Sequence, residues 1–580
     1  MKRFACVVLC AFLFYTSVVA ADESPAEKSG AGSQQVERDD SFGSGLPAGD
    51  GLKWLDWILI GCYALATIGV GVHFSRRQRS TREYFVGSGN LHPLIVGISI
   101  FATLMSTISY LSAPGEAMGK GPVGVLMGLT IMPLVYITVA YGLLPILMKQ
   151  RVTSVYELLE TKLGLSIRLL GATMFLMLRL VWMTLLVYLA AKALTVMMGV
   201  HPKWIPLIVL VTGTVSVIYT TLGGLRAVVV TDCMQTILLF VGAVLVIVTI
   251  SWDFGGFGWF PTTWQENWDT QPFFSFDLRT RVTGVGTILS GYVWIVATQG
   301  GDQTCVQRYM ATRDLKAARQ AYVTKIIVGV TVSLTLVCVG FALLGYFQAH
   351  PEYMPVGKTI EGNADDLFPF FVAYRLPMGV SGLVVAAMFA AAMSSIDSGV
   401  NSITAVVKTD FLDRLGFGPK TEKGDVRTAQ LLALGIGIVV VLGSSFIKYI
   451  EGNILEVTSK AVNLLTTPIF GLFVFALFIP FARTAGVWVG AICGTSTAAM
   501  ISFSGAIVGV LATRWGVDPG LFGVELITQI DPATGEQWLT AEDPISFQWA
   551  GPAALLVNVV TGSLASWLLP AKKRPSPPVE

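Results

Sequence analysis

Charged residues are scarce in this chain of 580 residues. Asp, Glu, Lys and Arg make up 13% of it, whereas hydrophobic residues make up 53%. A water-soluble globular protein carries about 25% charged residues, so this composition excludes an ordinary soluble domain. The mean hydropathy is +0.67, which is typical of a chain that crosses a membrane many times. The net charge of +2 is small, and where the charges lie is more informative than their sum.

Histidine and cysteine are also rare. The four histidines are scattered along the chain and form no ligand cluster. Of the seven cysteines, Cys6 and Cys10 lie near the N-terminus and the others lie in apolar stretches. We therefore expect neither a zinc site nor a disulfide framework. The sequence also lacks a nucleophile elbow, a phosphate-binding loop and a paired acid and base, so it gives little support to an enzyme.

The N-terminus carries a short apolar run, residues 4–19, which follows two basic residues and ends in small ones. This pattern predicts a signal peptide over residues 1–20. The alternative is a first membrane helix, although the run is shorter than the roughly 20 residues that a helix needs to span a bilayer. Residues 21–50 are polar and contain Gly, Ser and Pro, which predicts a flexible exported tail.

Long apolar stretches dominate the rest of the chain and predict about 13 transmembrane helices. We place them at residues 54–74, 93–117, 122–147, 167–198, 203–222, 226–251, 281–302, 323–348, 379–408, 427–447, 454–481, 485–512 and 546–570.

Basic residues indicate how these spans are oriented. Four arginines follow the first span, between residues 76 and 82, and basic loops face the cytoplasm. The mature N-terminus is therefore expected outside. An odd number of spans then places the tail 571–580, with Lys572, Lys573 and Arg574, in the cytoplasm. The most basic inner loop is expected at 308–325.

The most informative stretch is Gly379–Asp410, because polar residues interrupt the second half of an apolar helix. These residues are Ser394, Ser395, Asp397, Ser398, Asn401, Ser402 and Thr404. Lipid cannot solvate such groups, so they must face protein, water or an ion. Helical spacing places Ala391, Ser394 and Ser398 on one stripe, with Ser395 beside it. This oxygen-rich surface suits a small hard cation. The alternative is close helix packing through small residues and back-bonded serines, which explains Asp397 poorly.

Two spans contain the Gly, Pro and hydroxyl residues that break membrane helices. They are 93–117, with Pro114 and Gly115, and 281–302, with Gly300 and Gly301. If the span at 54–74 is set aside, the two broken spans are the first and the sixth. Corresponding broken helices in two five-helix halves are typical of inverted-repeat transporters. The alternative is a pair of Gly-rich packing helices.

This division predicts the following organisation: an extra helix at 54–74, a first repeat at 93–251, a second repeat at 281–481 and accessory helices at 485–570.

Four motifs, in order, together resemble the sodium/solute symporter family, which includes the sodium–glucose, iodide, monocarboxylate and proline carriers. The motifs lie at Tyr84–Leu91, Tyr219–Gln235, Asp302–Arg313 and Phe389–Ser402. The resemblance implies an all-α polytopic membrane protein with the five-plus-five inverted-repeat fold of the leucine-transporter type. Thirteen spans with the N-terminus outside are similar to the iodide and monocarboxylate branches of the family.

The resemblance also implies a main sodium site. The family's two backbone ligands from the first broken helix fall on Ala102 and Met105, and its ligands from the eighth core helix fall on Ala391, Ser394 and Ser395.

Some family members bind a second sodium, and its positions fall on Asp232, Asp397 and Ser398. The family more often has a hydroxyl at Asp397, so this site is expected to hold a sodium or a proton. For Asp232, the alternative is a structural acid that pairs with a basic residue.

The solute residues of the family carry over poorly. The glutamine and asparagine of the glucose carriers fall on Ser109 and Trp182, which argues against a glucose-type pocket. Two roles remain open for Arg179: it pairs with a solute carboxylate, or it is structural and extends to the cytoplasmic interface. The solute candidates are Ser106, Ser109, Tyr110, Arg179, Gln299 and Asp302.

The sequence thus predicts a sodium-coupled symporter that imports a small polar organic solute, such as a sugar or a carboxylate, by alternating access. Sodium is the expected metal ion, and the lipid bilayer and the solute are the expected partners, with no nucleic acid. The expected location is the plasma (cell inner) membrane. The alternatives are a proton-coupled carrier that uses Asp397 or Asp232, and a non-transporting sensor or channel on the same scaffold.

Overall fold

The computed structural model describes residues 51–75, 81–87, 89–150, 152–198, 200–269, 272–355, 357–419, 421–446, 454–530 and 537–569. The predicted signal peptide, the exported tail, the arginines at 76–79 and the C-terminal tail 571–580 lie outside these residues. The described part is helical apart from one antiparallel ribbon, in which β1 (Leu526–Ile530) pairs with β2 (Gln537–Ala541).

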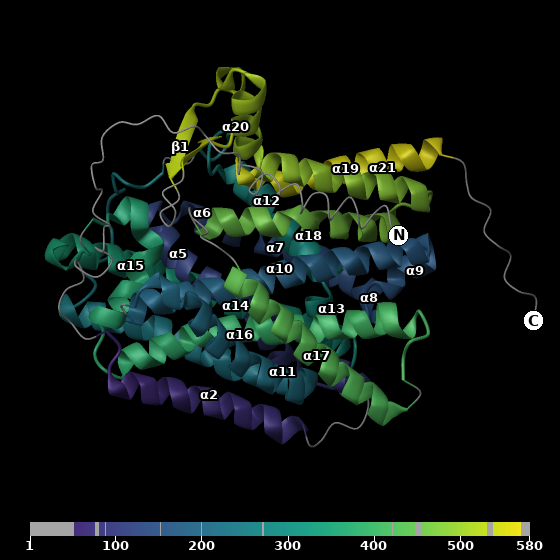
Figure 1. The fold of residues 1–580 in the computed structure, drawn as a ribbon, viewed down its shortest axis with the longest axis horizontal. Coiled ribbons are helices and arrows are strands. Elements are labelled where there is room, and N and C mark those ends of the chain that lie inside the picture. The colour runs from purple at the N-terminus through teal and green to yellow at the C-terminus, as the bar shows by residue number, and fades with distance from the viewer. Residues whose placement is uncertain are drawn as a thin grey trace, which may run out of the picture. The chain divides into compact units, whose positions relative to one another are not determined.

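The predicted spans coincide with continuous helices or with helices that are interrupted (Figure 1). The longer helices are α2 (Trp54–Ser75), α4 (Pro93–Leu104) with α5 (Thr107–Gly119), α6 (Val123–Thr130) with α7 (Met132–Ile137) and α8 (Leu144–Gln150), α10 (Leu165–Met198), α11 (Ile205–Asp253), α12 (Gly284–Gly301), α14 (Leu315–Ala349), α16 (Val380–Val406), α17 (Glu422–Phe446), α18 (Ile454–Phe478), α19 (Thr484–Ser502) and α21 (Ala550–Leu568).

Shorter helices connect these spans. They are α3 (Thr81–Val86), α9 (Glu157–Leu163), α13 (Gln303–Met310), α15 (Ile360–Tyr374) and α20 (Ser504–Trp515), the π-helical turns η1 (Thr138–Leu143) and η4 (Val407–Asp413), and the 3-10 turns η2 (Pro202–Trp204), η3 (Pro351–Tyr353), η5 (Pro519–Phe522) and η6 (Phe547–Trp549).

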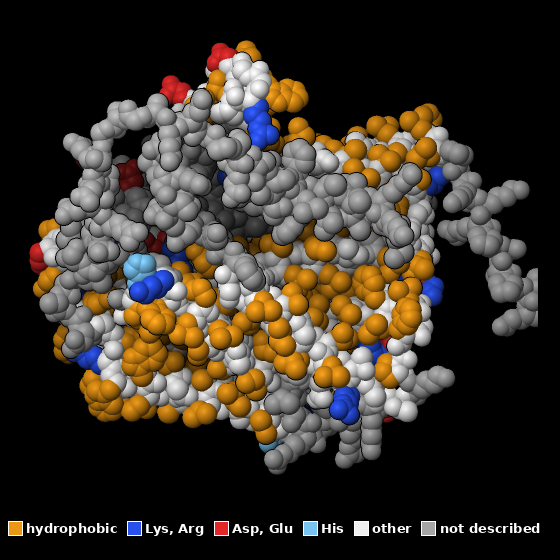
Figure 2. All heavy atoms as spheres, viewed as in Figure 1, with side chains coloured by type: hydrophobic (Ala, Val, Ile, Leu, Met, Phe, Trp, Pro, Cys, Tyr) orange, Lys and Arg blue, Asp and Glu red, His pale blue; other side chains and the backbone are white. Residues whose placement is uncertain are grey.

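Length and hydropathy support a membrane-spanning arrangement. Within the described ranges, nine helices are long and apolar enough to cross a membrane alone, and the bent pair α4–α5 makes a tenth. The other predicted spans correspond to α12 and to the shorter apolar stretches Ile205–Ile218 and Val462–Phe478. Hydrophobic side chains cover much of the face in Figure 2, and most of its visible Lys and Arg side chains lie toward the left and right ends. This distribution fits helices that run across a bilayer.

Both predicted breaks are present. α4 ends at Leu104, Met105 and Ser106 have extended backbone, and α5 leaves at an angle of 70°. In the second case, α12 ends at Gly301, and α13 begins after Asp302, which is also extended. The Asp302 side chain accepts the N–H of Thr304 and so caps α13. A third interruption separates the two predicted spans inside α11, where Gly224 has a φ of 59° that suits glycine.

Two sequence expectations were wrong. Residues 308–325 do not form a loop: they belong mainly to α13 and to the start of α14, and Arg308 and Lys325 are buried. The stretch predicted as one span at 485–512 is divided at Phe503 into α19 and α20, and α20 contacts strand β2. The division at Phe503 was not apparent, because an apolar stretch reads the same whether it is straight or bent. The charges of residues 308–325 favoured a loop, but a helix carries them equally well.

The core of the described part is built around α16. Every residue from Ala390 to Val406 is buried, and α16 contacts α2, α4, α5, α10 and α11. The extra helix α2 holds the start of α16: the carboxylate of Asp56 accepts the backbone N–H groups of Gly379 and Gly382, each at 2.8 Å. An acid is stabilised at a helix N-terminus by the free N–H groups and the helix dipole.

Candidate functional site

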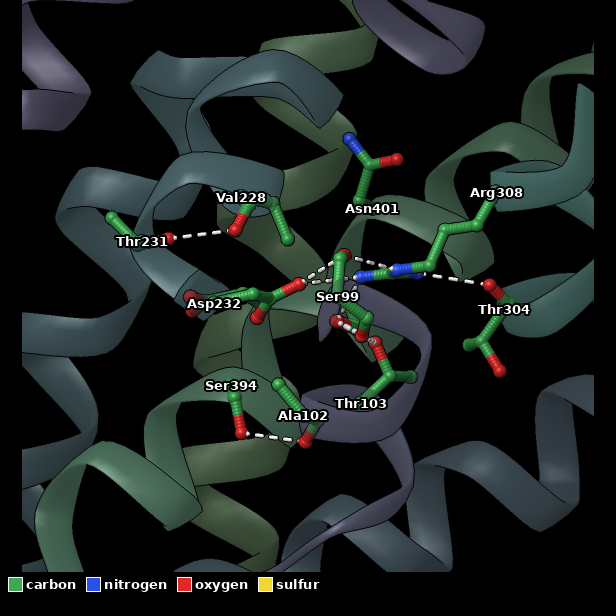
Figure 3. Close-up of polar contacts among 12 residues, drawn as sticks. Ser99, Ala102, Thr103, Val228, Thr231, Asp232, Thr304, Arg308, Ser394 and Asn401 are labelled. Carbon is green, nitrogen blue, oxygen red and sulfur yellow. Dashed lines mark hydrogen bonds and ion pairs between the residues drawn. The ribbon is translucent and has the colours of Figure 1, made fainter. Parts of the chain in front are cut away.

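The polar half of α16 faces the break between α4 and α5. The hydroxyl of Ser394 lies 2.9 Å from the carbonyl oxygen of Ala102 on α4 and 3.0 Å from the carbonyl oxygen of Ala391 on its own helix. Figure 3 shows the Ser394 side chain directed at Ala102. One hydroxyl therefore lies beside two of the carbonyl oxygens in the predicted sodium site.

Ser395 makes the corresponding contacts one position along. Its hydroxyl lies 3.3 Å from the carbonyl oxygen of Thr103 and 3.4 Å from that of Met105. These carbonyl groups are available because a helix end leaves its last C=O groups without donors in the next turn, and the extended backbone at Met105 ends α4. Oxygen ligands of this kind suit hard cations, so the donor set fits sodium.

A buried ion pair lies one turn further along the same interface. Arg308 of α13 places Nη2 3.2 Å from Oδ2 of Asp232 on α11, and both side chains are almost fully buried. The Arg308 guanidinium also donates to the hydroxyls of Ser99, at 2.7 Å, and Ser398, at 2.5 Å. Ser99 in turn donates to Asp232 at 2.5 Å (Figure 3). A guanidinium thus lies between two of the residues predicted for the second cation site.

The predicted second-site residues have different partners. Ser398 shares a hydrogen bond of 2.9 Å with Thr103, so this cluster adjoins the first broken helix. Asp397 accepts a hydrogen bond of 2.6 Å from Thr220 of α11. Asp232 keeps one buried carboxylate oxygen, Oδ1, with no hydrogen-bond partner among the described residues.

A small cavity lies beside the two helix breaks. Its volume is about 30 Å³, and α4, α10, α12 and α18 contribute its walls. Its lining residues are Thr103, Leu104, Leu178, Arg179, Trp182, Trp294, Thr298, Asp302, Val462 and Thr466. This volume holds one or two water molecules and is far smaller than the 300 Å³ or more of a typical ligand pocket.

Arg179 and Asp302 meet at this cavity as an ion pair, and Arg179 also donates to Thr304 at 2.9 Å. Arg179 is buried, so it does not extend to the interface as one of the two sequence interpretations required. Its Nε–H has no hydrogen-bond partner in the described part of the chain. A buried N–H group without an acceptor destabilises the fold, unless a bound ligand accepts its hydrogen bond.

The other solute candidates lie elsewhere. The Tyr110 hydroxyl donates to the carbonyl of Leu239 at 3.4 Å, within the hydrophobic core. Gln299 is buried and accepts a hydrogen bond from Tyr309. Ser106 caps α5 by accepting the N–H of Ser109 at 3.4 Å. The cavity described above is not lined by any of them.

Sequence reasoning missed several residues at these sites. Arg308 was read as a loop cation, although it lies within the third motif. Trp294, Thr298 and Thr466 line the cavity, but lone aromatic and hydroxyl residues in apolar spans give no distinctive signal. Trp182 also lines it, at the position where the resemblance places a solute residue of the glucose carriers. Only the packing of α10, α12 and α18 brings them together.

The model of the family described as "Sodium:solute symporter family" matches residues 84–494. The chain belongs to this family. The match includes both helix breaks, the Asp232–Arg308 pair and the polar half of α16. The fold is therefore the five-plus-five inverted repeat of the leucine-transporter type, and the chain is a sodium-coupled solute transporter of the membrane.

Two bacterial relatives are named as sodium/sialic acid symporters. The chain is 29% identical to SiaT of Proteus mirabilis over 486 residues, which covers 81% of this chain and 91% of the relative. It is 30% identical to NanT of Aliivibrio fischeri over 450 residues, which covers 76% and 86%. A mouse relative named sodium-coupled monocarboxylate transporter 1 is 26% identical, with 76% and 71% covered.

A solved structure is also similar. It is the substrate-bound, outward-open state of a Na⁺-coupled sialic acid symporter, which reveals a novel Na⁺ site. The TM-score is 0.70 at 26% sequence identity, over 90% of this chain and 99% of that one.

Proposed function

We propose that this transporter imports a small organic acid together with sodium. The relatives named above carry sialic acid or monocarboxylates in their names, and both are acids. The cavity beside the helix breaks contains Arg179, whose guanidinium keeps an unpartnered donor. Arginine is well suited to bind a carboxylate, since it offers charge and two parallel N–H donors.

The observation that carries this proposal is the contact between Ser394 and Ala102. Through it, the polar half of α16 reaches the freed carbonyl oxygens of α4. We assign the sodium ligands to Ala102, Met105, Ala391, Ser394 and Ser395. A cation held by both helices stabilises the state in which they are joined.

The transport of sodium and solute is coupled if the solute also binds preferentially to the state in which α4 and α16 are joined. Each ligand then raises the affinity for the other by the same factor. The membrane potential adds about 2.3 kcal/mol per charge for every 100 mV. Because the cavity is too small for an organic acid, the solute site must widen, by separation of α10 from α12 and α18. This widening is the expected conformational step of alternating access.

Arg308 bears on the second predicted cation site. It provides Asp232 with a built-in counter-ion, so a cation bound by Asp232 and Ser398 has to displace the guanidinium. Asp397 carries a further carboxylate in the same interface. We propose that Asp397 is the residue through which a second sodium, or a proton, enters the cycle.

The arrangement in the cell rests on the charge pattern. We propose that the mature N-terminus lies outside, the C-terminus lies in the cytoplasm and the protein resides in the plasma (cell inner) membrane. The first repeat extends over residues 93–251 and the second over 281–481. The chain acts as a carrier and not as an enzyme.

Uptake by proteoliposomes tests the function. The purified protein is reconstituted, and uptake of sialic acid, short monocarboxylates, neutral sugars and amino acids is measured with and without an inward sodium gradient. We expect accumulation of an acid only with the gradient. Uptake that follows a pH gradient and ignores sodium would establish the proton-coupled alternative. Equilibration of solutes without accumulation would indicate a channel.

A further inference from the structure

A basic cavity lies at the start of α14, far from the sodium ligands in the sequence. Its volume is about 710 Å³. Its walls come from the segment that precedes α4, from α7 and from the first turns of α14. The lining residues are Asn90, Leu91, His92, Pro93, Leu94, Tyr136, Arg313, Lys316, Arg319, Gln320, Val323 and Thr324.

The cavity carries an excess of positive charge. Lys316 and Arg319 lie on successive turns of α14, and Arg313 lies just before its N-cap residue, Asp314. The lining includes no Asp or Glu. Arg313 pairs with Asp314 at 3.1 Å, and both are exposed. Among the described residues, Lys316 has no ion pair. Positive charge without an opposing carboxylate is suited to bind an anion.

Arg319 is held in place by groups that leave its charge uncompensated. Its Nε donates to the carbonyl oxygen of Ala140 at 2.9 Å, and its guanidinium lies 4.4 Å from the centre of the Tyr141 ring. A carbonyl group and an aromatic face orient a guanidinium without neutralising it. The rigid geometry lowers the entropic cost of binding an anion.

The same face of α14 turns apolar immediately beyond the basic residues. Val323, Ile327 and Leu334 follow at helical spacing, and their side chains are exposed. On the opposite wall, Leu94 of α4 is 52% exposed. Since α14 crosses the membrane, these side chains face the acyl chains. The basic cavity therefore lies where an exposed apolar track begins, at the level of the lipid headgroups.

We propose that this cavity binds the phosphate headgroup of an anionic phospholipid, with Lys316 and Arg319 as its ligands and Val323 and Ile327 as the track for an acyl chain. A neutral or zwitterionic lipid does not provide the net negative charge that matches the cavity. A water-soluble phosphate compound shares the headgroup chemistry but makes no use of the apolar track. This proposal does not depend on the identity of the transported solute.

Lipid binding to the purified full-length protein tests the proposal. Native mass spectrometry in detergent measures binding of phosphatidylglycerol, with phosphatidylcholine as the comparison. The test variant is the double replacement Lys316→Gln with Arg319→Gln. The control is Lys162→Gln with Arg427→Gln, which removes two exposed basic residues from other helices, α9 and α17. Each basic residue near a membrane surface is worth about fivefold in affinity for anionic lipid.

We expect the test variant to bind phosphatidylglycerol roughly 30-fold more weakly, while the control binds like the wild type. Inorganic phosphate at millimolar concentration should not displace the lipid. Equal lipid binding by wild type and test variant would overturn the proposal. Displacement of the lipid by inorganic phosphate, or protection from thermal unfolding by phosphate alone, would overturn the lipid proposal. Either result would indicate that the ligand is a soluble phosphate compound.

Two further variants keep the test interpretable. Lys316→Gln alone changes an exposed side chain, so folding should be preserved. The affinity for phosphatidylglycerol should fall about fivefold. Ile327→Ser leaves the charges intact and removes part of the apolar track. Weaker binding of phosphatidylglycerol by Ile327→Ser, together with unchanged binding of inorganic phosphate, is the result expected for a lipid. Unaltered lipid binding by both single variants would contradict it.

Discussion

Arg308 and Asp232 form an ion pair in the middle of the helical core, with 3.2 Å between Nη2 and Oδ2 and with exposures of 1% and 0%. The pair joins α13, which follows the second helix break, to α11. The guanidinium also donates to the hydroxyls of Ser99 and Ser398 and to the carbonyl oxygen of Thr304. The second broken helix is thus connected to the same α4–α16 interface that contains the proposed sodium ligands.

Because the two residues form a buried pair, we expect the effects of replacing Asp232 and Arg308 on stability to depend strongly on each other. Removal of one member of a buried ion pair costs about 3–5 kcal/mol, because the other charge is left uncompensated. Asp232→Asn and Arg308→Gln should each lower the thermal unfolding temperature markedly. The double variant should be more stable than the sum of the two single effects implies. Additive effects in this double-mutant cycle, measured in detergent, would contradict the pairing.

Ser394 and Ser395 should set the sodium requirement. Ser394→Ala and Ser395→Ala should each raise the sodium concentration for half-maximal uptake roughly tenfold, since an interaction with a charged group is worth about 1.5–3 kcal/mol. Ser381→Ala is the control, because Ser381 is buried on the same helix and its hydroxyl donates to the carbonyl groups of Leu376 and Pro377, just before that helix. An unchanged sodium requirement in both serine variants would remove them as ligands.

Asp397 should determine the charge moved with each solute. Asp397→Asn keeps a side-chain oxygen for the Thr220 hydrogen bond but removes the negative charge. We expect the current per transported solute to fall while the main sodium site still functions. Asp413→Asn, at the exposed end of the same helix, is the control. An unaltered ratio of charge to solute would assign Asp397 to packing.

Arg179 should decide the affinity for the acid. Arg179→Lys keeps the charge but not the planar fork of donors, so the solute concentration for half-maximal uptake should rise roughly tenfold. The sodium requirement at saturating solute should stay the same. Arg168→Lys serves as the control, because Arg168 is also buried on α10 and pairs with acids, Glu160 and Asp410. An equal effect of both replacements would indicate a structural role for Arg179.

Glu160 gives a prediction for acidic pH. The Arg414 guanidinium, and then that of Arg168, hold the pKa of the Glu160 carboxyl below its usual value. A lowered folded pKa stabilises the fold above the ordinary glutamate pKa of about 4.3, and this contribution is lost as pH falls through the lowered value. Arg414→Gln should therefore lower the free energy of unfolding slightly near neutral pH, because solvent screens this exposed pair.

The difference between wild type and Arg414→Gln should shrink below pH 4 and at high salt, which screens the exposed pair. This difference in stability is measured by thermal unfolding of both proteins across pH 3–7. Arg427→Gln, which removes another exposed arginine, is the control. A difference that grows on acidification would contradict the sign of the pKa shift.

Helix positions and both helix breaks could be predicted from the sequence. Apolar runs are long because each must cover the thickness of a bilayer, and Gly, Pro and hydroxyl residues inside them mark broken backbone. The break after Leu104 lies within the predicted span 93–117, although Pro114 and Gly115 lie inside α5 and not at the break. The family resemblance supplied the residues of the proposed sodium site. Among them, Ser394 contacts Ala102 and Ala391, and Ser395 contacts Met105.

The partners of the buried charges could not be predicted. Arg308 reads as a loop cation next to other basic residues, yet it lies against Asp232, 76 positions away. The Arg179–Asp302 pair joins two different spans in the same way. Neither pairing follows from periodicity, because a helical pattern gives the face of a side chain but not the helix that packs against that face.

The sequence by itself determined that the chain crosses a membrane, where its helices run and where two of them break, since hydropathy and backbone chemistry are local properties. Only the tertiary structure decided which charges neutralise each other and which polar groups meet at a cavity. The reason is electrostatic: in a medium of low dielectric constant a buried charge must have a partner, and helix packing alone determines which residue comes within reach.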